Sequence, residues 1–172
     1  MDKKVTLLVL ICIVGILLVC ALPKNADRIT NAIVNETNGD VAFCYYDSSG
    51  KIDVLRVDWY SKDGEEILSE TFFSDGGSHA YLFFYEDNLC INIGRTNKTH
   101  FFDREGKELS INVMPEEIRS RDSFEEWEHS IGKISYTLGQ YEYVYENPRL
   151  LKDKAKLTIT NNNSSVIIYE SP

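Results

Sequence analysis

One local pattern recurs five times in this chain: an aromatic pair followed by four residues that end in glycine or asparagine. The copies read YYDSSG, WYSKDG, FFSDGG, FFYEDN and FFDREG, and they end at positions 50, 64, 77, 88 and 106. Asp or Ser at the first turn position caps backbone donors, and Gly or Asn at the last tolerates positive φ. Type I hairpin turns need both properties. The pattern therefore predicts consecutive hairpins, a β-meander in which each aromatic pair ends an incoming strand.

The apolar runs between these turns predict the strands. They lie near 41–46, 51–60, 65–73, 79–85, 89–94, 99–103 and 107–113, and later near 133–138, 141–145, 154–160 and 165–169. The apolar residues of 51–60 change parity midway, so a bulge is expected near Leu55 and Arg56. Residues 81–84 are apolar on both faces, which predicts a strand that is covered on both sides.

These elements predict a mainly β fold, an antiparallel β-meander with one short helix after Pro115. Phe124, Trp127 and Ile131 share one helical face there, and Ser123 can cap its start. A sandwich, a barrel and an incomplete propeller-like arrangement all remain open. The turns resemble those of β-propeller blades in bacterial surface proteins, but about eleven strands would make fewer than three four-stranded blades.

The N-terminus contains 18 consecutive uncharged residues, Val5 to Leu22, enough to cross about 30 Å of hydrocarbon as a helix. We expect residues 1–23 to form a membrane anchor, 24–40 a polar spacer with at most a helical turn or two, and 41–172 one β-rich domain outside the cytoplasm. A cleaved signal ending at Val19-Cys20-Ala21, which would make the protein secreted, and a lipoprotein acylated at Cys20 are the alternatives.

Beyond residue 23 the chain carries 26 acidic and 16 basic side chains. Nucleic acid is therefore an unfavourable partner, because affinity for it comes largely from Lys and Arg on phosphates. The two cysteines of this part, Cys44 and Cys90, could form a disulfide in an oxidising compartment, or remain two unpaired thiols in neighbouring strands. There is no CxxC motif for redox chemistry or zinc.

No catalytic, metal or cofactor motif stands out. The three histidines (His79, His100, His129) have no GxSxG elbow to serve, and Glu125 with His129 has the spacing of two metal ligands but no third. Neither a cofactor nor a metal is predicted. Carboxylates are so numerous that a glycosidase-like pair is conceivable, yet nothing selects two of them.

A row of tyrosines is the remaining candidate site. Tyr141, Tyr143 and Tyr145 alternate, so they share one strand face, and Tyr136 lies just upstream. Such a face suits stacking on sugar rings or a protein contact, or it is simply the core side of its strand.

The function expected from all this is a membrane-anchored, non-catalytic binding module whose partner is an envelope protein. The alternative is a carrier of a small lipid or sugar, and a carboxylate-based hydrolase comes third.

Overall fold

The computed structural model describes residues 29–47, 54–73, 80–93, 98–110, 132–147 and 154–171. They form eleven strands: β1 (Ile29–Val34), β2 (Val41–Asp47), β3 (Val54–Tyr60), β4 (Glu66–Phe73), β5 (Ala80–Tyr85), β6 (Asn88–Ile93), β7 (Lys98–Phe102), β8 (Gly132–Leu138), β9 (Tyr141–Asn147), β10 (Lys156–Thr160) and β11 (Ser165–Glu170). The fold of the described residues is mainly β, as predicted.

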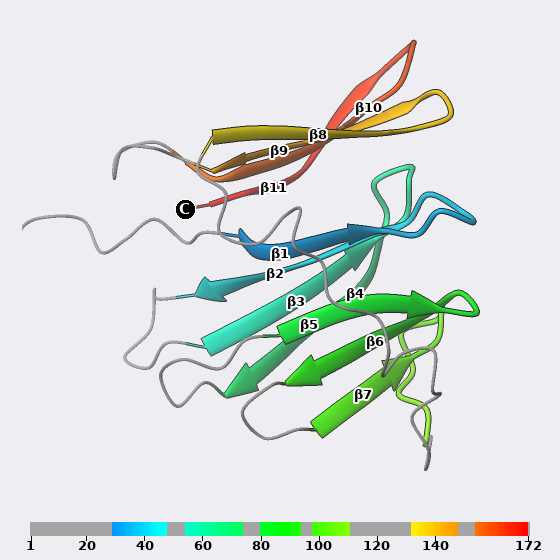
Figure 1. Cartoon of the computed structure of the whole chain (residues 1–172), viewed down its shortest axis with the longest axis vertical. Coiled ribbons are helices and arrows are strands. Elements are labelled where there is room, and N and C mark those ends of the chain that lie inside the picture. The colour runs from blue at the N-terminus through cyan, green and yellow to red at the C-terminus, as the bar shows by residue number, and fades with distance from the viewer. Residues whose placement is uncertain are drawn as a thin grey trace, which may run out of the picture.

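The strands form three antiparallel sheets in which sequence neighbours pair with one another. The first sheet has the order β1-β2-β3-β4, the second β5-β6-β7, and the third β11-β10-β9-β8. The three sheets lie in layers with the first sheet in the middle (Figure 1). This sequential pairing confirms the predicted β-meander, with the chain divided among three sheets.

The expected membrane anchor at residues 5–22 and the expected helix near residues 123–132 lie outside the described residues. Within the described segments, no helix has the length and apolarity needed to span a bilayer.

A dense apolar core joins the first sheet to the second. Trp59, Leu55 and Val57 from β3 meet Leu82 from β5 and Ile91 from β6, and each is at most 1% exposed. Fully burying a large apolar side chain contributes about 1.5–3 kcal/mol, so this cluster is a major source of stability. The space between these two sheets is filled by side chains.

Strand β2 is buried on both faces and so connects two cores. Ala42 and Cys44 face the second sheet, whereas Val41, Phe43 and Tyr45 face the third. The second core continues through strands β9, β10 and β11. An apolar run such as VAFCY is typical of a strand that is covered on both sides.

The second sheet is also covered on its other face. Leu82 points into the core with the first sheet, but its neighbour Phe83 packs with Cys90 and Phe101 in a separate buried cluster. The prediction that residues 81–84 form a strand covered on both sides is therefore confirmed.

Three local predictions were wrong. Residues 29–34, expected to be part of a polar spacer, form β1 and pair with β2. In the described part of 107–113, an isolated bridge between Phe102 and Glu108 replaces the expected strand. The bulge expected near Leu55 and Arg56 is not found there, because Leu55 and Trp59 lie on the same buried face of β3. The register of β3 with β4 instead shifts between Trp59 and Tyr60, at the end of β3.

The turn pattern was right at two turns and wrong at a third, and the turns predicted at 47–50 and 74–77 extend outside the described residues. Gly64 and Gly106 have φ of 86° and 75°, and Ser61 and Asp103 accept backbone N–H groups inside their turns. In the turn of β5 and β6, however, the left-handed residues are Glu86 and Asp87. Asn88 belongs to β6, so this is a tighter two-residue turn.

Candidate functional site

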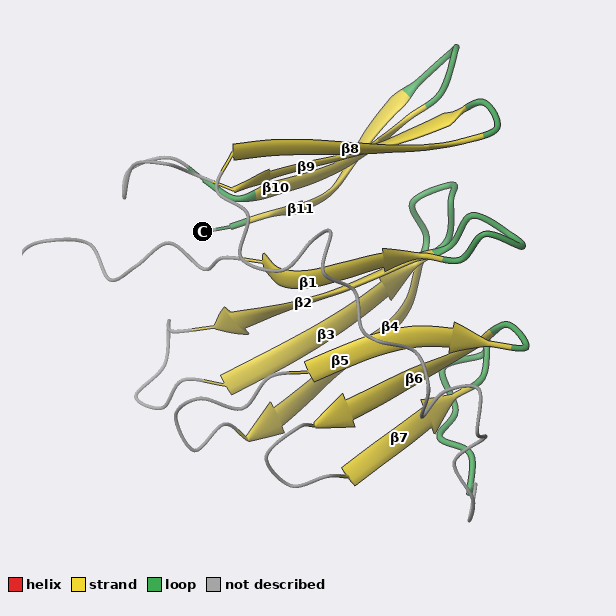
Figure 2. Ribbon diagram, in the orientation of Figure 1, coloured by secondary structure: helices red, strands yellow, loops and turns green. Residues whose placement is uncertain are grey.

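All six turns of the described residues lie at one end of the three sheets. They are residues 35–40, 61–65, 86–87, 103–107, 139–140 and 161–164, and Figure 2 shows these loops on the right-hand side of the molecule. The arrangement follows from the meander, since every second connection returns to the same end and the three sheets are stacked in the same orientation. We call this surface the turn end.

An ion pair between distant residues holds two of these turns together. Arg104 donates from Nε to Asp40 Oδ2 at 3.0 Å and from Nη2 to Asp40 Oδ1 at 3.2 Å. The side chain of Asp40 is completely buried, whereas that of Arg104 is 53% exposed. The bidentate geometry fixes the plane of the guanidinium, and the bonds and charge of Asp40 raise the pKa of Arg104.

Two further kinds of contact, hydrogen bonds and a cation–π contact, join neighbouring turns. Asn35 and Asn38 each donate from Nδ2 to Asp87 Oδ1, at 3.0 and 3.2 Å, which joins the first sheet to the turn of β5 and β6. The ammonium group of Lys62 lies 5.7 Å from the ring centre of Tyr141 in the third sheet. Turns from all three sheets therefore form one connected surface.

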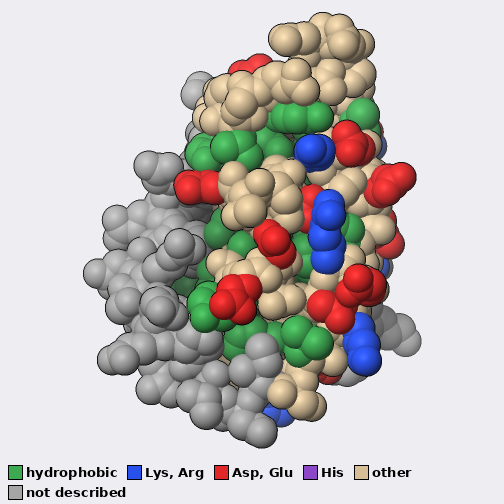
Figure 3. Space-filling model, turned by 90° about the vertical axis from the view of Figure 1, so that its right-hand side faces the viewer, with side chains coloured by type: hydrophobic (Ala, Val, Ile, Leu, Met, Phe, Trp, Pro, Cys, Tyr) green, Lys and Arg blue, Asp and Glu red, His purple; other side chains and the backbone are tan. Residues whose placement is uncertain are grey.

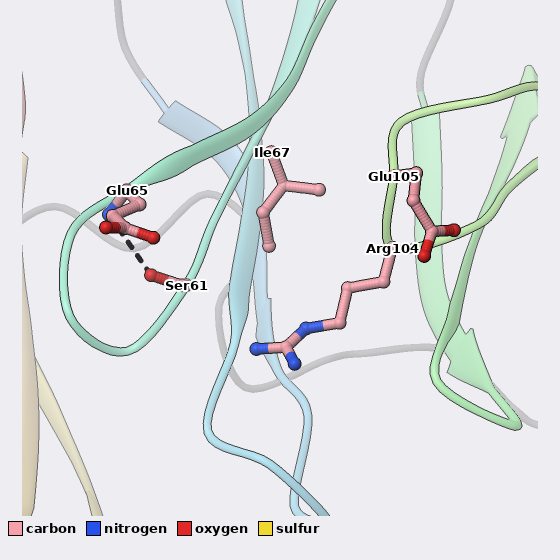
Figure 4. A pocket seen from close by; sticks show the side chains of 5 residues that line it. All are labelled: Ser61, Glu65, Ile67, Arg104 and Glu105. Carbon is pink, nitrogen blue, oxygen red and sulfur yellow. Dashed lines mark hydrogen bonds between the residues drawn. The ribbon is translucent and has the colours of Figure 1, made fainter.

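A hollow of about 330 Å³ opens between two of the turns. Ser61, Glu65 and Ile67 line one side of it, and Arg104 and Glu105 line the other. Arg104 reaches from its own turn toward the turn of β3 and β4, with Ile67 between them (Figure 4). The hollow thus combines hydrogen-bond donors, two carboxylates and one apolar side chain.

The turn end is strongly acidic. Its six turns contain eight acidic residues and three basic ones. The acidic residues are Glu36, Asp40, Asp63, Glu65, Glu86, Asp87, Asp103 and Glu105, and the basic ones are Lys62, Arg104 and Lys107. Figure 3, which faces this end, shows acidic side chains spread among a few basic ones. Such a surface attracts cationic groups and repels phosphate.

The predicted tyrosine row lies against the core. Tyr143 and Tyr145 are fully buried, and their hydroxyls donate to the carbonyl groups of Gly39 and Ile29. Burial raises the pKa of Tyr143 to about 12. Tyr136 and Tyr141 are half-buried and pack against the same cluster. Of the two interpretations given by the sequence, this placement matches the core side of the strand.

The two candidate disulfide cysteines are not bonded to each other. Cys44 lies in the core between the first and second sheets, and Cys90 lies in the cluster on the other face of the second sheet. Burial raises the pKa of Cys90 to about 12. The bond is absent because β6, on which Cys90 lies, directs this side chain away from the core that contains Cys44.

A second polar cluster lies on the first sheet, on the face toward the third. The carboxylate of Asp58 is buried and accepts hydrogen bonds from Ser69 Oγ, at 2.7 Å, and from Tyr45. Burial raises the pKa of Asp58. Ser69 lies directly opposite Asp58 on β4. The cluster is therefore a cross-strand tie, with its carboxylate occupied by protein hydroxyls.

Comparison of the chain with protein-family models, with curated proteins and with solved structures finds no match in any of the three. The geometry of the turn end is therefore the basis for assigning a function.

The sequence located most of these turns but gave no reason to group them. The patterns SKDG and DREG predict turns that contain Lys62 and Arg104, but a turn pattern alone predicts only a hairpin connection. Asp40 falls within the predicted spacer, residues 24–40. The signal that could have found the site is the direction of the chain, since alternate turns of a meander meet at one end.

Proposed function

We propose that this chain is a non-catalytic interaction module that contacts a protein partner through the turn end. The observation that carries the proposal is the tie between Asp40 and Arg104, which holds two turns of different sheets in one fixed arrangement. Rigid strands that present charged turns suit recognition, because the scaffold supplies fixed positions and the turns supply the chemistry.

The module is, in this proposal, anchored in a membrane by residues 5–22 and faces away from the cytoplasm. The supporting observation is the uncharged run Val5 to Leu22 behind Lys3 and Lys4. We expect the intact mass of the protein from native membranes to match the full chain, allowing for loss of Met1. A mass that begins at Leu22 would replace the anchor with a cleaved signal and make the protein secreted.

The carrier of a lipid or sugar has less support. A carrier that used the space between the first and second sheets would need a cavity there, and that space is occupied by fully buried side chains such as Trp59 and Leu82. The hydrolase also has less support, because the buried carboxylate of Asp58 is already occupied by hydrogen bonds from Ser69 and Tyr45.

Among the arrangements considered, we favour a layered stack, either a sandwich or an incomplete propeller, over a closed barrel. The first sheet buries side chains on both of its faces, against the second and the third sheets. A sheet that packs on both sides is a middle layer, whereas a barrel wall encloses one interior.

The proposal is tested by site-specific photocross-linking of the full chain in the membranes of its native cells. A photoreactive amino acid at Asp63, exposed on the turn end, should give one reproducible protein adduct that an excess of the unlabelled chain suppresses. The matched control places the same group at Ser135, exposed on β8 of the third sheet. Equal adducts from the two positions, or none from Asp63, would contradict a partner at the turn end.

A further inference from the structure

Arg104, which lines the hollow, carries more hydrogen-bond donors than its partner Asp40 accepts. A guanidinium carries five N–H groups, and two of those on Arg104 are directed to Asp40. Within the described segments, Asp40 is the only hydrogen-bond acceptor of this side chain, so three N–H groups remain on a side chain that lines the hollow. Because both oxygens of Asp40 are engaged by Arg104, the plane of this donor group is fixed before any ligand arrives. Such a group suits a neutral acceptor, such as a peptide carbonyl.

The charge of the side chains that line the hollow favours a ligand that also carries a positive charge. The positive charge of Arg104 is balanced by Asp40, so Glu65 and Glu105 leave the lining with an excess of negative charge. An anionic ligand would meet these two carboxylates as well as the acidic turns around them. A cationic side chain would instead be attracted to the carboxylates while its own backbone is within reach of the guanidinium.

We infer that this hollow binds a lysine or arginine side chain from an exposed segment of a partner protein. The cationic head contacts Glu65 on one side of the hollow, the carbonyl group of the same segment accepts from Arg104, and the aliphatic stem lies on Ile67. The charge of Glu105, on the other side of the hollow, adds to the attraction (Figure 4). A volume of about 330 Å³ is near the lower limit for a ligand site, which suits a single side chain. The inference rests on the proposed function and names the chemistry of its partner.

The test uses the full chain in detergent and a synthetic peptide as the probe. The peptide is an acetylated and amidated serine-glycine decamer that carries two lysines, and its control has norleucine at both positions. A carbodiimide joins the lysine amine to any carboxylate in direct contact, and mass spectrometry locates the link. We expect links at Glu65 in preference to the other carboxylates, and a severalfold lower yield in 0.5 M salt.

Substitutions of the two glutamates test whether the links depend on their carboxylates. E65Q/E105Q should lower the total yield of links at least fivefold, whereas E65D/E105D, which keeps both charges, should retain most of it. The matched control E142Q/E170Q removes two exposed carboxylates of the third sheet and should change little. Links spread evenly over the acidic residues, or an unchanged yield in E65Q/E105Q, would overturn the inference.

Failure of the inference can be told apart from failure of the proposed function. If the group at Asp63 still captures a partner while the lysine peptide shows no preference for the hollow, the partner docks at the turn end through different chemistry. If E65Q/E105Q abolishes both the peptide links and the partner adduct, the same contact accounts for both results.

Discussion

At the scale of single residues, the contact with the largest consequence is Arg104 on Asp40. The two residues are 64 positions apart, and the carboxylate is completely buried while the guanidinium is half-exposed. A buried carboxylate needs such a partner, because loss of its hydration is otherwise uncompensated. The pair thus stabilises the fold and positions the donor group of the hollow.

Replacement of Arg104 by alanine should lower the free energy of unfolding by about 1–3 kcal/mol, because Asp40 would remain buried without its partner. Denaturant unfolding of the full chain in detergent measures the change. The control Lys107→Ala removes an exposed cation from the same turn, and its effect should stay within about 0.5 kcal/mol. Equal effects of the two substitutions would show that Asp40 does not depend on Arg104.

Asp58 should make the stability depend on pH in a defined direction. Burial raises its pKa above the ordinary 3.8, so in the interval between 3.8 and the folded-state pKa the folded chain keeps a proton that the unfolded chain has lost. The stabilising contribution is full below pH 3.8 and disappears as the pH rises through the folded-state pKa.

The substitution Asp58→Asn removes this titration. We expect the free energy of unfolding to decrease less between about pH 4 and pH 7 in the variant than in the natural chain. The exposed Asp63→Asn serves as the control and should keep the natural pH profile. Parallel profiles for Asp58→Asn and the natural chain would contradict the role of burial at Asp58.

At the scale of elements, the turns show how far local sequence determines local structure. Gly64 and Gly106 adopt positive φ as their positions in the turn pattern require. Between β5 and β6 the same reasoning failed, because the register of the two strands pairs Tyr85 with Asn88 and leaves only two residues for the turn. The strand pairing overrode the four-residue pattern, and Glu86 and Asp87 accept left-handed conformations as a result.

Glu86 offers a test of this strain. Asparagine tolerates the left-handed region better than glutamate, so Glu86→Asn should raise the free energy of unfolding by about 0.5–1 kcal/mol. Thermal or denaturant unfolding provides the measurement. Glu36→Asn, in an exposed turn position outside the left-handed region, is the matched control and should give no gain. A loss of stability at position 86 would show that the glutamate side chain has a contact that outweighs its strain.

At the scale of the whole molecule, the cysteines report on the layering of the sheets. Cys44 and Cys90 are buried in separate cores and are not bonded to each other. In the folded chain both should react slowly with a maleimide, since burial hinders access and raises the pKa of Cys90.

In denaturant without reductant, both cysteines should react fully, and peptide mapping by mass spectrometry can follow each of them separately. The control repeats the labelling in denaturant after reduction, which should add no further label at either position. Label that appears at Cys44 and Cys90 only after reduction would show a disulfide and contradict the separate cores.

The sequence by itself determined the features that depend on near neighbours. The apolar runs between turn signals indicated ten of the eleven strands, and Ser61 and Asp103 marked turns that the structure contains. Period and turn chemistry act over a few residues, so they can be read without the rest of the fold. Strand β1 was missed because ITNAIV alternates poorly, and its place is secured by pairing with β2.

Only the tertiary structure decided which faces meet and which distant residues become partners. The tyrosine row gave no sign of whether it faced water or core, since its alternation is the same in both cases; contact with β1 and the turn after it buried Tyr143 and Tyr145. The contact of Asp40 with Arg104 likewise required the first and second sheets to stack with their turns at one end. Such contacts depend on long-range packing, which a local pattern of residues does not encode.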